Sequence, residues 1–272
     1  RMGGFVSLCP FYEQQAVFDV AKARNFAPVT WRWNTGVDTW LVRIPTLLCP
    51  SDQEMLRRPV GENSYKMCLG TTIRNNQNWN RPEPNGIAYI LHNRSHLENP
   101  SRRRAATRIR DIRDGTANTL IMAERRLGNF EKNDDIANTY DFDGSSPTNN
   151  NINEWYDLCW ATANQFNGKR YDNNPTLLIA SRGNQMRKPG QRWADGLPQF
   201  SGFNTVMGPN GPSCVRQGIG SYGVFTASSR HPTIVNGALG DGSVRQFADT
   251  INLGVWRGLG TKANGEQLGD EW

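Results

Sequence analysis

The sequence predicts an α+β domain built on an antiparallel β-sheet with few helices and long loops. Short apolar segments bounded by turn residues are common, few segments show helical spacing, and strands do not alternate with helices as a parallel sheet requires. Only 37% of the 272 residues are hydrophobic, so much of the chain is expected in loops. The sequence shows no domain boundary. We predict one domain over 1–272 with a loop-rich insertion over 130–220.

The first half contains one predicted helix and two predicted strands. An amphipathic helix is expected over 10–24, because Phe11 and Val17 belong to an apolar set at helical spacing with polar residues opposite. Extended segments over 38–48 and 65–72 are rich in apolar and β-branched residues. We therefore expect most of the remaining first half to be loop.

The C-terminal part has the strongest patterning. Apolar runs bounded by turn residues predict strands at 119–123, 223–227, 234–239 and 243–248. Gly240-Asp241-Gly242 joins the last two as a hairpin, and Asp241 is predicted to satisfy backbone amides there. A short helix, capped by Asp249 or Thr250, is expected to run through Trp256. The region 183–220 is rich in Gly and Pro and is expected to be an excursion from the core.

Five cysteines without a C-x-x-C pair argue against a zinc or redox motif. In an oxidising compartment we expect Cys49 to pair with Cys68 and Cys159 with Cys214, leaving Cys9 over. In a reducing compartment all five would be buried thiols.

Basic residues are slightly in excess, with a formal net charge of +6. The densest positive run contains Arg102, Arg103 and Arg104, which would suit an anionic glycan or an acidic partner, or would protect a solvated strand edge. The modest net charge does not require nucleic acid, and none is expected as a partner. Trp155 and Trp193 lie in polar segments and are candidates for stacking on sugars, with packing as the alternative.

An acidic loop around Asp141 and Asp143 resembles part of a calcium loop. With Gly144 at the sixth loop position, Asn150 stands where an EF-hand needs a bidentate Glu. We therefore exclude an EF-hand and keep two readings open, a structural calcium ion and a plain solvated loop.

Catalytic motifs are missing from the sequence. There is no Gly-x-Ser-x-Gly elbow, and three histidines offer little acid–base chemistry. His92 and His96 could share a helix face as metal ligands, but Asn and Pro nearby argue against that helix. His231 is predicted to bond a carboxylate or carbonyl, and Glu124 to pair with an arginine such as Arg125 or Arg230. Asp114, which precedes a glycine, is predicted to be a turn residue.

Several motifs, taken together and in order, resemble one family. They are the helix start at 4–14, Cys49-Pro50-Ser51-Asp52, Asn63-Ser64-Tyr65, the segment 111–124 with Asp-Gly-Thr and Glu124, Ser228-Ser229-Arg230-His231-Pro232, Asp241-Gly242-Ser243, and the segment 256–266. In these motifs the chain resembles the DUF1559 family of pseudopilin-like proteins, which is also labelled as a solute-binding family.

The resemblance implies a type IV pilin-like globular head, export to the cell surface, and no enzyme activity. Partners would be copies of the chain or other pilin-like subunits, and contact with a membrane would come only through an N-terminal prepilin helix, which is expected to lie before Arg1. The alternative function is a carbohydrate- or solute-binding module at the cell surface.

Overall fold

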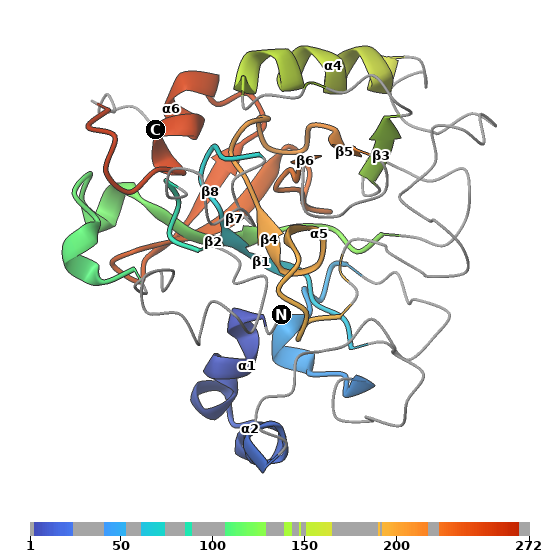
Figure 1. The fold of residues 1–272 in the computed structure, drawn as a ribbon, viewed down its shortest axis with the longest axis vertical. Coiled ribbons are helices and arrows are strands. Elements are labelled where there is room, and N and C mark those ends of the chain that lie inside the picture. The colour runs from blue at the N-terminus through green and yellow to red at the C-terminus, as the bar shows by residue number, and fades with distance from the viewer. Residues whose placement is uncertain are drawn as a thin grey trace.

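The structure is a computed structural model, and it describes residues 3–23, 41–52, 61–73, 85–88, 107–128, 139–142, 147, 151–164, 190, 192–216 and 223–266. Two sheets lie at its centre, with helices at opposite ends (Figure 1). Few helices and a strand-based core confirm the predicted α+β class.

The larger sheet has five strands in the order β4-β1-β2-β7-β8. Their bounds are β1 Tyr65–Cys68, β2 Leu120–Glu124, β4 Gly202–Phe203, β7 Ile234–Leu239 and β8 Val244–Ala248. Three of the four pairings are antiparallel, as predicted, but the edge strand β4 runs parallel to β1. The sheet is therefore mixed, because β4 reaches its edge by a long connection that sequence patterning does not reveal.

The β7–β8 hairpin forms as predicted. Its turn places Gly242 at φ 89°, a left-handed conformation that glycine adopts without a steric penalty. Alternate β7 side chains are buried, including Val235 and Leu239, which pack with Trp256. Trp256 lies in the helix α6 (Leu253–Leu259). The predicted cap was wrong: Asn252, not Asp249 or Thr250, accepts hydrogen bonds from the first-turn amides of α6.

A smaller sheet, in the order β3-β5-β6, lies beside the helix α4. Its elements are β3 Thr139–Phe142, β5 Ser213–Arg216 and β6 Gly223–Val224, with α4 spanning Ile152–Asn164. Helix α4 was not predicted in this Asn-rich segment, although Trp155, Cys159 and Ala163 recur every four residues and are buried. Cys159 is bonded to Cys214 of β5, which confirms one predicted disulfide.

The predicted helix over 10–24 is broken. Helix α1 (Gly4–Leu8) leads into a 3-10 turn, η1 (Cys9–Tyr12), and α2 (Gln15–Ala23) begins only after Glu13 turns the chain at φ 63°. Pro10 is the second residue of η1, in the first turn, where its missing amide costs nothing. The three segments form the end of the molecule opposite α4 (Figure 1).

Two other expectations were wrong in the described residues. The extended segment over 38–48 contains the 3-10 turn η3 (Pro45–Leu47) in its described part, because proline begins a turn readily. The region 183–220 is not an excursion: helix α5 (Pro198–Ser201) and β4 lie in it, with Trp193 and Phe200 fully buried. Two further 3-10 turns are η6 (Ile109–Asp111) and η7 (Thr116–Asn118).

Candidate functional site

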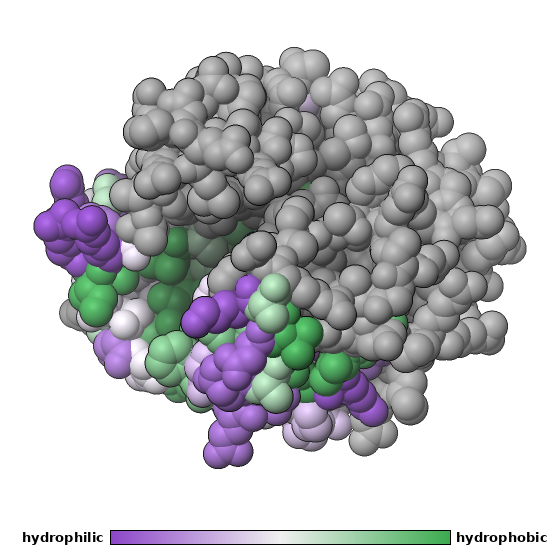
Figure 2. Space-filling model, turned by 60° about the horizontal axis from the view of Figure 1, so that its bottom comes forward, coloured by the Kyte–Doolittle hydropathy of each residue, from purple (hydrophilic) through white to green (hydrophobic). Residues whose placement is uncertain are grey.

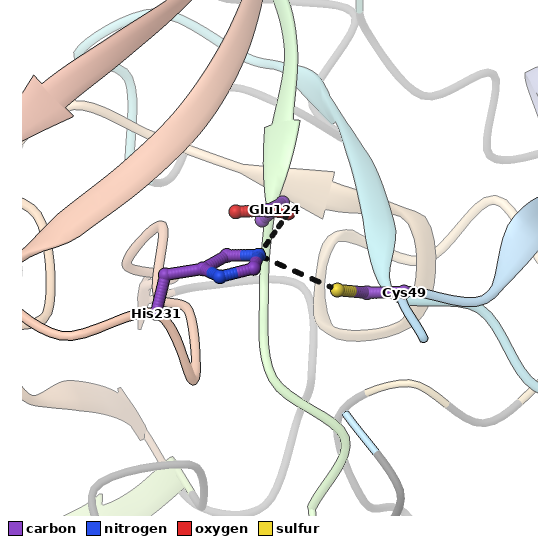
Figure 3. A group of neighbouring side chains, drawn as sticks. All are labelled: Cys49, Glu124 and His231. Carbon is purple, nitrogen blue, oxygen red and sulfur yellow. Dashed lines mark hydrogen bonds and ion pairs between the residues drawn. The ribbon is translucent and has the colours of Figure 1, made fainter. Parts of the chain in front are cut away.

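Three polar side chains from distant parts of the chain meet beside the larger sheet. Cys49 follows η3, Glu124 ends β2, and His231 lies in the turn before β7 (Figure 3). The Nε2 atom of His231 lies 3.6 Å from Oε1 of Glu124 and 3.8 Å from Sγ of Cys49. One donor atom from each residue lies within 4.8 Å of the other two. The imidazole thus joins a thiol and a carboxylate.

Glu124 is buried and held in place by Asn236 of β7. The backbone N–H of Asn236 donates to Oε2 at 2.9 Å, and its side-chain amide lies 3.1 Å from both carboxylate oxygens. Only 5% of the Glu124 side chain is exposed, compared with 33% for His231. The carboxylate therefore has its direction set by β7, and His231 forms the solvent-facing side of the cluster.

A second carboxylate fixes the loops that carry the cluster. Asp52 accepts a hydrogen bond from the Leu127 amide at 2.7 Å and forms an ion pair with Arg230 at 3.2 Å. Leu127 follows β2 and Arg230 precedes His231. Because Asp52 closes the turn that begins at Cys49, these contacts hold the thiol, the end of β2 and the histidine loop together.

Burial raises the pKa of the Cys49 thiol, and the negative charges of Glu124 and Asp52 act in the same direction. Tyr65, which faces Glu124 across the β1–β2 pair, also has its pKa raised, first by burial and then by Cys49 and Glu124. In the protein alone Cys49 is thus held as a thiol rather than a reactive thiolate.

The geometry separates two kinds of chemistry. A nucleophilic Cys-His pair needs one imidazole nitrogen on the thiol while a third group orients the ring through the other. Here both the thiol and the carboxylate face Nε2, so the arrangement is not a proton relay. Convergence on one point suits instead a shared proton or a shared ion.

The structure corrects the other predicted disulfide. Cys49 and Cys68 are both free and buried, as is Cys9. Cys68 faces the carbonyl of Gly260, and Cys9 contacts the hydroxyl of Tyr12. Cys49 faces His231 instead of Cys68 because the turn after η3 directs it toward the end of β2. Spacing in sequence could not show this direction.

The predicted glycan-stacking residues are inside the protein. Trp155 and Trp193 are each 0% exposed and pack in separate hydrophobic clusters, so neither offers a ring face to a sugar. Arg102, Arg103, Arg104, His92, His96 and Asp143 lie outside the described residues. The backbone of Asp141 lies in β3, but its side chain is not described, and the calcium reading stays a prediction.

The turn residues act as predicted, with one difference in partner. Asp241 accepts from the amide and hydroxyl of Ser243 within its own hairpin, and these bonds lower its pKa. Asp114 accepts instead from the amides of Asn264 and Gly265, each at 2.9 Å, and so ties the C-terminal turn to the start of η7. Glu124 was expected beside an arginine, but the structure places its Oε1 3.6 Å from Nε2 of His231, slightly beyond hydrogen-bond distance.

A family model described as SBP_bac_10, protein of unknown function (DUF1559), matches residues 3–254. The chain belongs to the DUF1559 family. Neither a curated protein nor a solved structure matches this family member. In the part of the chain that the structure describes, no helix has the length and apolar character needed to cross a membrane.

The cluster lies where three motifs of this DUF1559 protein meet: Cys49 to Asp52, the segment ending at Glu124, and Ser228 to Pro232. Glu124 and His231 were predicted to be structural residues, but the role of Asn236, which has no motif around it, was not predicted. The sequence does offer one signal for Cys49 and His231 as positioned residues. Each precedes a proline, and a proline restricts the backbone of the residue before it.

Proposed function

We propose that this DUF1559 protein is an exported, non-enzymatic subunit of a cell-surface assembly, with a pilin-like head that associates with copies of itself or with other pilin-like subunits. The observation that carries the proposal is the Cys159–Cys214 disulfide. Disulfides persist in secreted and surface proteins and are rare in a reducing cytosol. The bond lies inside a hydrophobic cluster, as a structural disulfide does, rather than in an exposed redox motif.

The N-terminal end supports a role in association. Phe11 of η1 is 83% exposed, and Val20 of α2 is 39% exposed. Figure 2 turns this end toward the viewer, where hydrophobic and hydrophilic side chains lie next to one another. Large exposed aromatic side chains are enriched where proteins meet partners. This end of the chain is therefore the proposed contact surface.

The burial of Trp155 and Trp193 favours a structural subunit over a carbohydrate-binding module. A sugar needs an accessible aromatic face, and these rings have none. The site at Glu124 also lacks the relay geometry of a nucleophilic enzyme, which supports the non-enzymatic part of the proposal.

The test is the location and assembly of the full-length protein in its native cells. Antibody labelling of intact cells should place it outside the cytosol, and mass spectrometry without reductant should recover Cys159 joined to Cys214. A cytosolic protein with both thiols reduced would contradict the proposal.

Assembly is tested with Phe11→Asp, which should abolish surface assemblies without unfolding the head. The matched control is Ile109→Asp, because Ile109 is 78% exposed but lies in η6, away from the N-terminal segments. Equal assembly of both variants would contradict the proposed contact surface.

A further inference from the structure

The convergence of Cys49, Glu124 and His231 has the composition of a metal site. We propose that these three side chains bind one divalent transition-metal ion of the zinc type. The inference goes beyond the proposed assembly role and does not depend on it.

The distances fit this ion. Zinc binds sulfur at about 2.3 Å and nitrogen or oxygen at about 2.0–2.2 Å, so tetrahedral ligands lie about 3.4–3.6 Å apart. The Nε2 of His231 lies 3.6 Å from the Glu124 carboxylate and 3.8 Å from the Cys49 sulfur. The Cys49 sulfur and the Glu124 carboxylate lie within 4.8 Å of each other, so these two atoms would approach by up to about 1.2 Å as all three bind one ion.

The direction of the donors supports the same conclusion. Figure 3 shows Glu124 and Cys49 on the same side of the imidazole, with one ring nitrogen facing both. Asn236 holds the carboxylate through its backbone and side-chain amides. Metal-binding carboxylates are commonly fixed by hydrogen bonds of this kind, which orient the ligand. Asn236 is thus a positioning residue for the ion.

The donor set selects the class of metal. A sulfur and an imidazole suit zinc and similar transition metals, whereas calcium and magnesium prefer oxygen ligands. Cys49 would lose its proton to solvent as it binds, so a thiolate and a carboxylate would balance the two charges of the ion. Charge balance matters because Cys49 and Glu124 are both buried.

Three protein ligands leave a fourth position free. His231 is the most exposed of the three, so the fourth position faces the solvent side, where a water molecule or a partner side chain could occupy it. Zinc enzymes keep such a fourth position for water or substrate, whereas structural zinc sites have four protein ligands, so a partner side chain in the fourth position is the arrangement that agrees with a non-enzymatic subunit. The ion would join the turn after η3, the end of β2 and the loop before β7, three segments that no disulfide of the described residues connects.

The experiment uses the full chain, freed of metal by a chelator and then titrated with Zn²⁺ and with Co²⁺. Cobalt reports on sulfur directly, because a Co²⁺–thiolate bond gives a charge-transfer absorption band. We expect tight binding that Ca²⁺ does not displace, and the thiolate band on adding Co²⁺. A wild-type protein that folds but shows no such band would overturn the proposal without recourse to any variant.

The variants assign the ligands. Cys49→Ser should remove the cobalt–thiolate band, and His231→Gln should weaken zinc binding at least 100-fold. Asn236→Ala should weaken it about tenfold, because it removes an orienting contact but no ligand. The matched control is Cys9→Ser, another buried free cysteine, which should keep both the band and the affinity.

Circular dichroism confirms that each variant folds before its affinity is compared. Equal zinc affinity in wild type, Cys49→Ser and His231→Gln would overturn the assignment. Metal binding with the expected ligands in a protein that forms no surface assembly would contradict only the proposed function, so the two proposals fail separately.

Discussion

The two sheets of this protein are stabilised in different ways. In the five-stranded sheet, the hairpin β7–β8 and helix α6 bury Val235, Leu239 and Trp256 in a cluster of ten buried residues. The three-stranded sheet has strands of only four, four and two residues, and a disulfide ties its central strand β5 to α4. Short strands bury little apolar surface, so the smaller sheet gains from a covalent bond what the larger sheet gains from packing.

The disulfide should give the largest effect. Replacing Cys159 and Cys214 together with alanine should lower the free energy of unfolding by about 4 kcal/mol, because the bond closes a loop with a sequence separation of 55. Denaturant unfolding without reductant measures the loss. Reductant should destabilise the wild type and leave the stability of the double variant unchanged. A double variant as stable as the oxidised wild type would show that the disulfide does not stabilise the smaller sheet.

The larger sheet should instead be sensitive to cavities. Leu239→Ala should lower the free energy of unfolding by about 3 kcal/mol, since Leu239 is fully buried against the strands and α6. The same denaturation assay, with the disulfide intact, measures it. Val244→Ala is the matched control on the adjoining strand: Val244 is 68% exposed and its truncation should change stability by less than about 0.5 kcal/mol. Equal losses would mean that burial does not distinguish the positions.

A buried amine should make the stability of the larger sheet depend on pH, whereas the stability of the smaller sheet depends on the redox state of its disulfide. Lys66 of β1 is fully buried and donates to the carbonyl of Asn63 at 2.7 Å. Burial, then the nearby charge of Arg125, hold the Lys66 pKa well below its usual value, while Asp52 opposes them.

The direction of the pH dependence follows from the number of protons that Lys66 binds in the folded and unfolded states. Between the lowered folded pKa and about 10.5, the unfolded chain carries the proton that folded Lys66 has lost, so the free energy of unfolding rises with pH. The Lys66 contribution should reach at most about 1.4 kcal/mol per pH unit, and Lys66→Met should remove it. Denaturation between pH 7 and 9 measures both slopes. Identical slopes in the two proteins would show that Lys66 does not titrate in this way.

The smallest expected effect is on the N-terminal cap of α6, the helix that packs on the larger sheet. Asn252→Ala should cost about 1 kcal/mol, because the Asn252 side chain accepts from the amides of Gly254 and Val255 at the start of α6. Asp249→Ala is the control, since Asp249 is exposed and lies outside that cap. Thermal or denaturant unfolding compares the two. A greater loss of stability for Asp249→Ala than for Asn252→Ala would indicate that Asp249 caps α6, as the sequence predicted.

Local patterns in the sequence predicted much of the larger sheet. Alternating side chains in β7, the Gly-Asp-Gly turn and the apolar run of β2 all depend on neighbours in sequence. The Cys159–Cys214 pair was also predicted, from compartment chemistry. Helix α4 was missed because its many polar residues hid the four-residue spacing of Trp155 and Cys159.

The candidate site was predicted only in part. His231 was expected to bond a carboxylate or carbonyl, and the structure places its Nε2 3.6 Å from the Glu124 carboxylate. The identity of that carboxylate, the place of Cys49 and the support from Asn236 depend on contacts between residues 107, 182 and 112 positions apart, which no local pattern encodes.

The sequence by itself determined the α+β class, the hairpin, the family and the residue types available for chemistry, because these follow from spacing and composition. Only the tertiary structure decided that Cys49 and Cys68 are free, that Cys49 faces His231, and that Trp155 and Trp193 are buried rather than exposed. The physical reason is that direction and burial depend on how distant segments pack. The same cysteine is a disulfide partner or a metal ligand according to what packing places beside it.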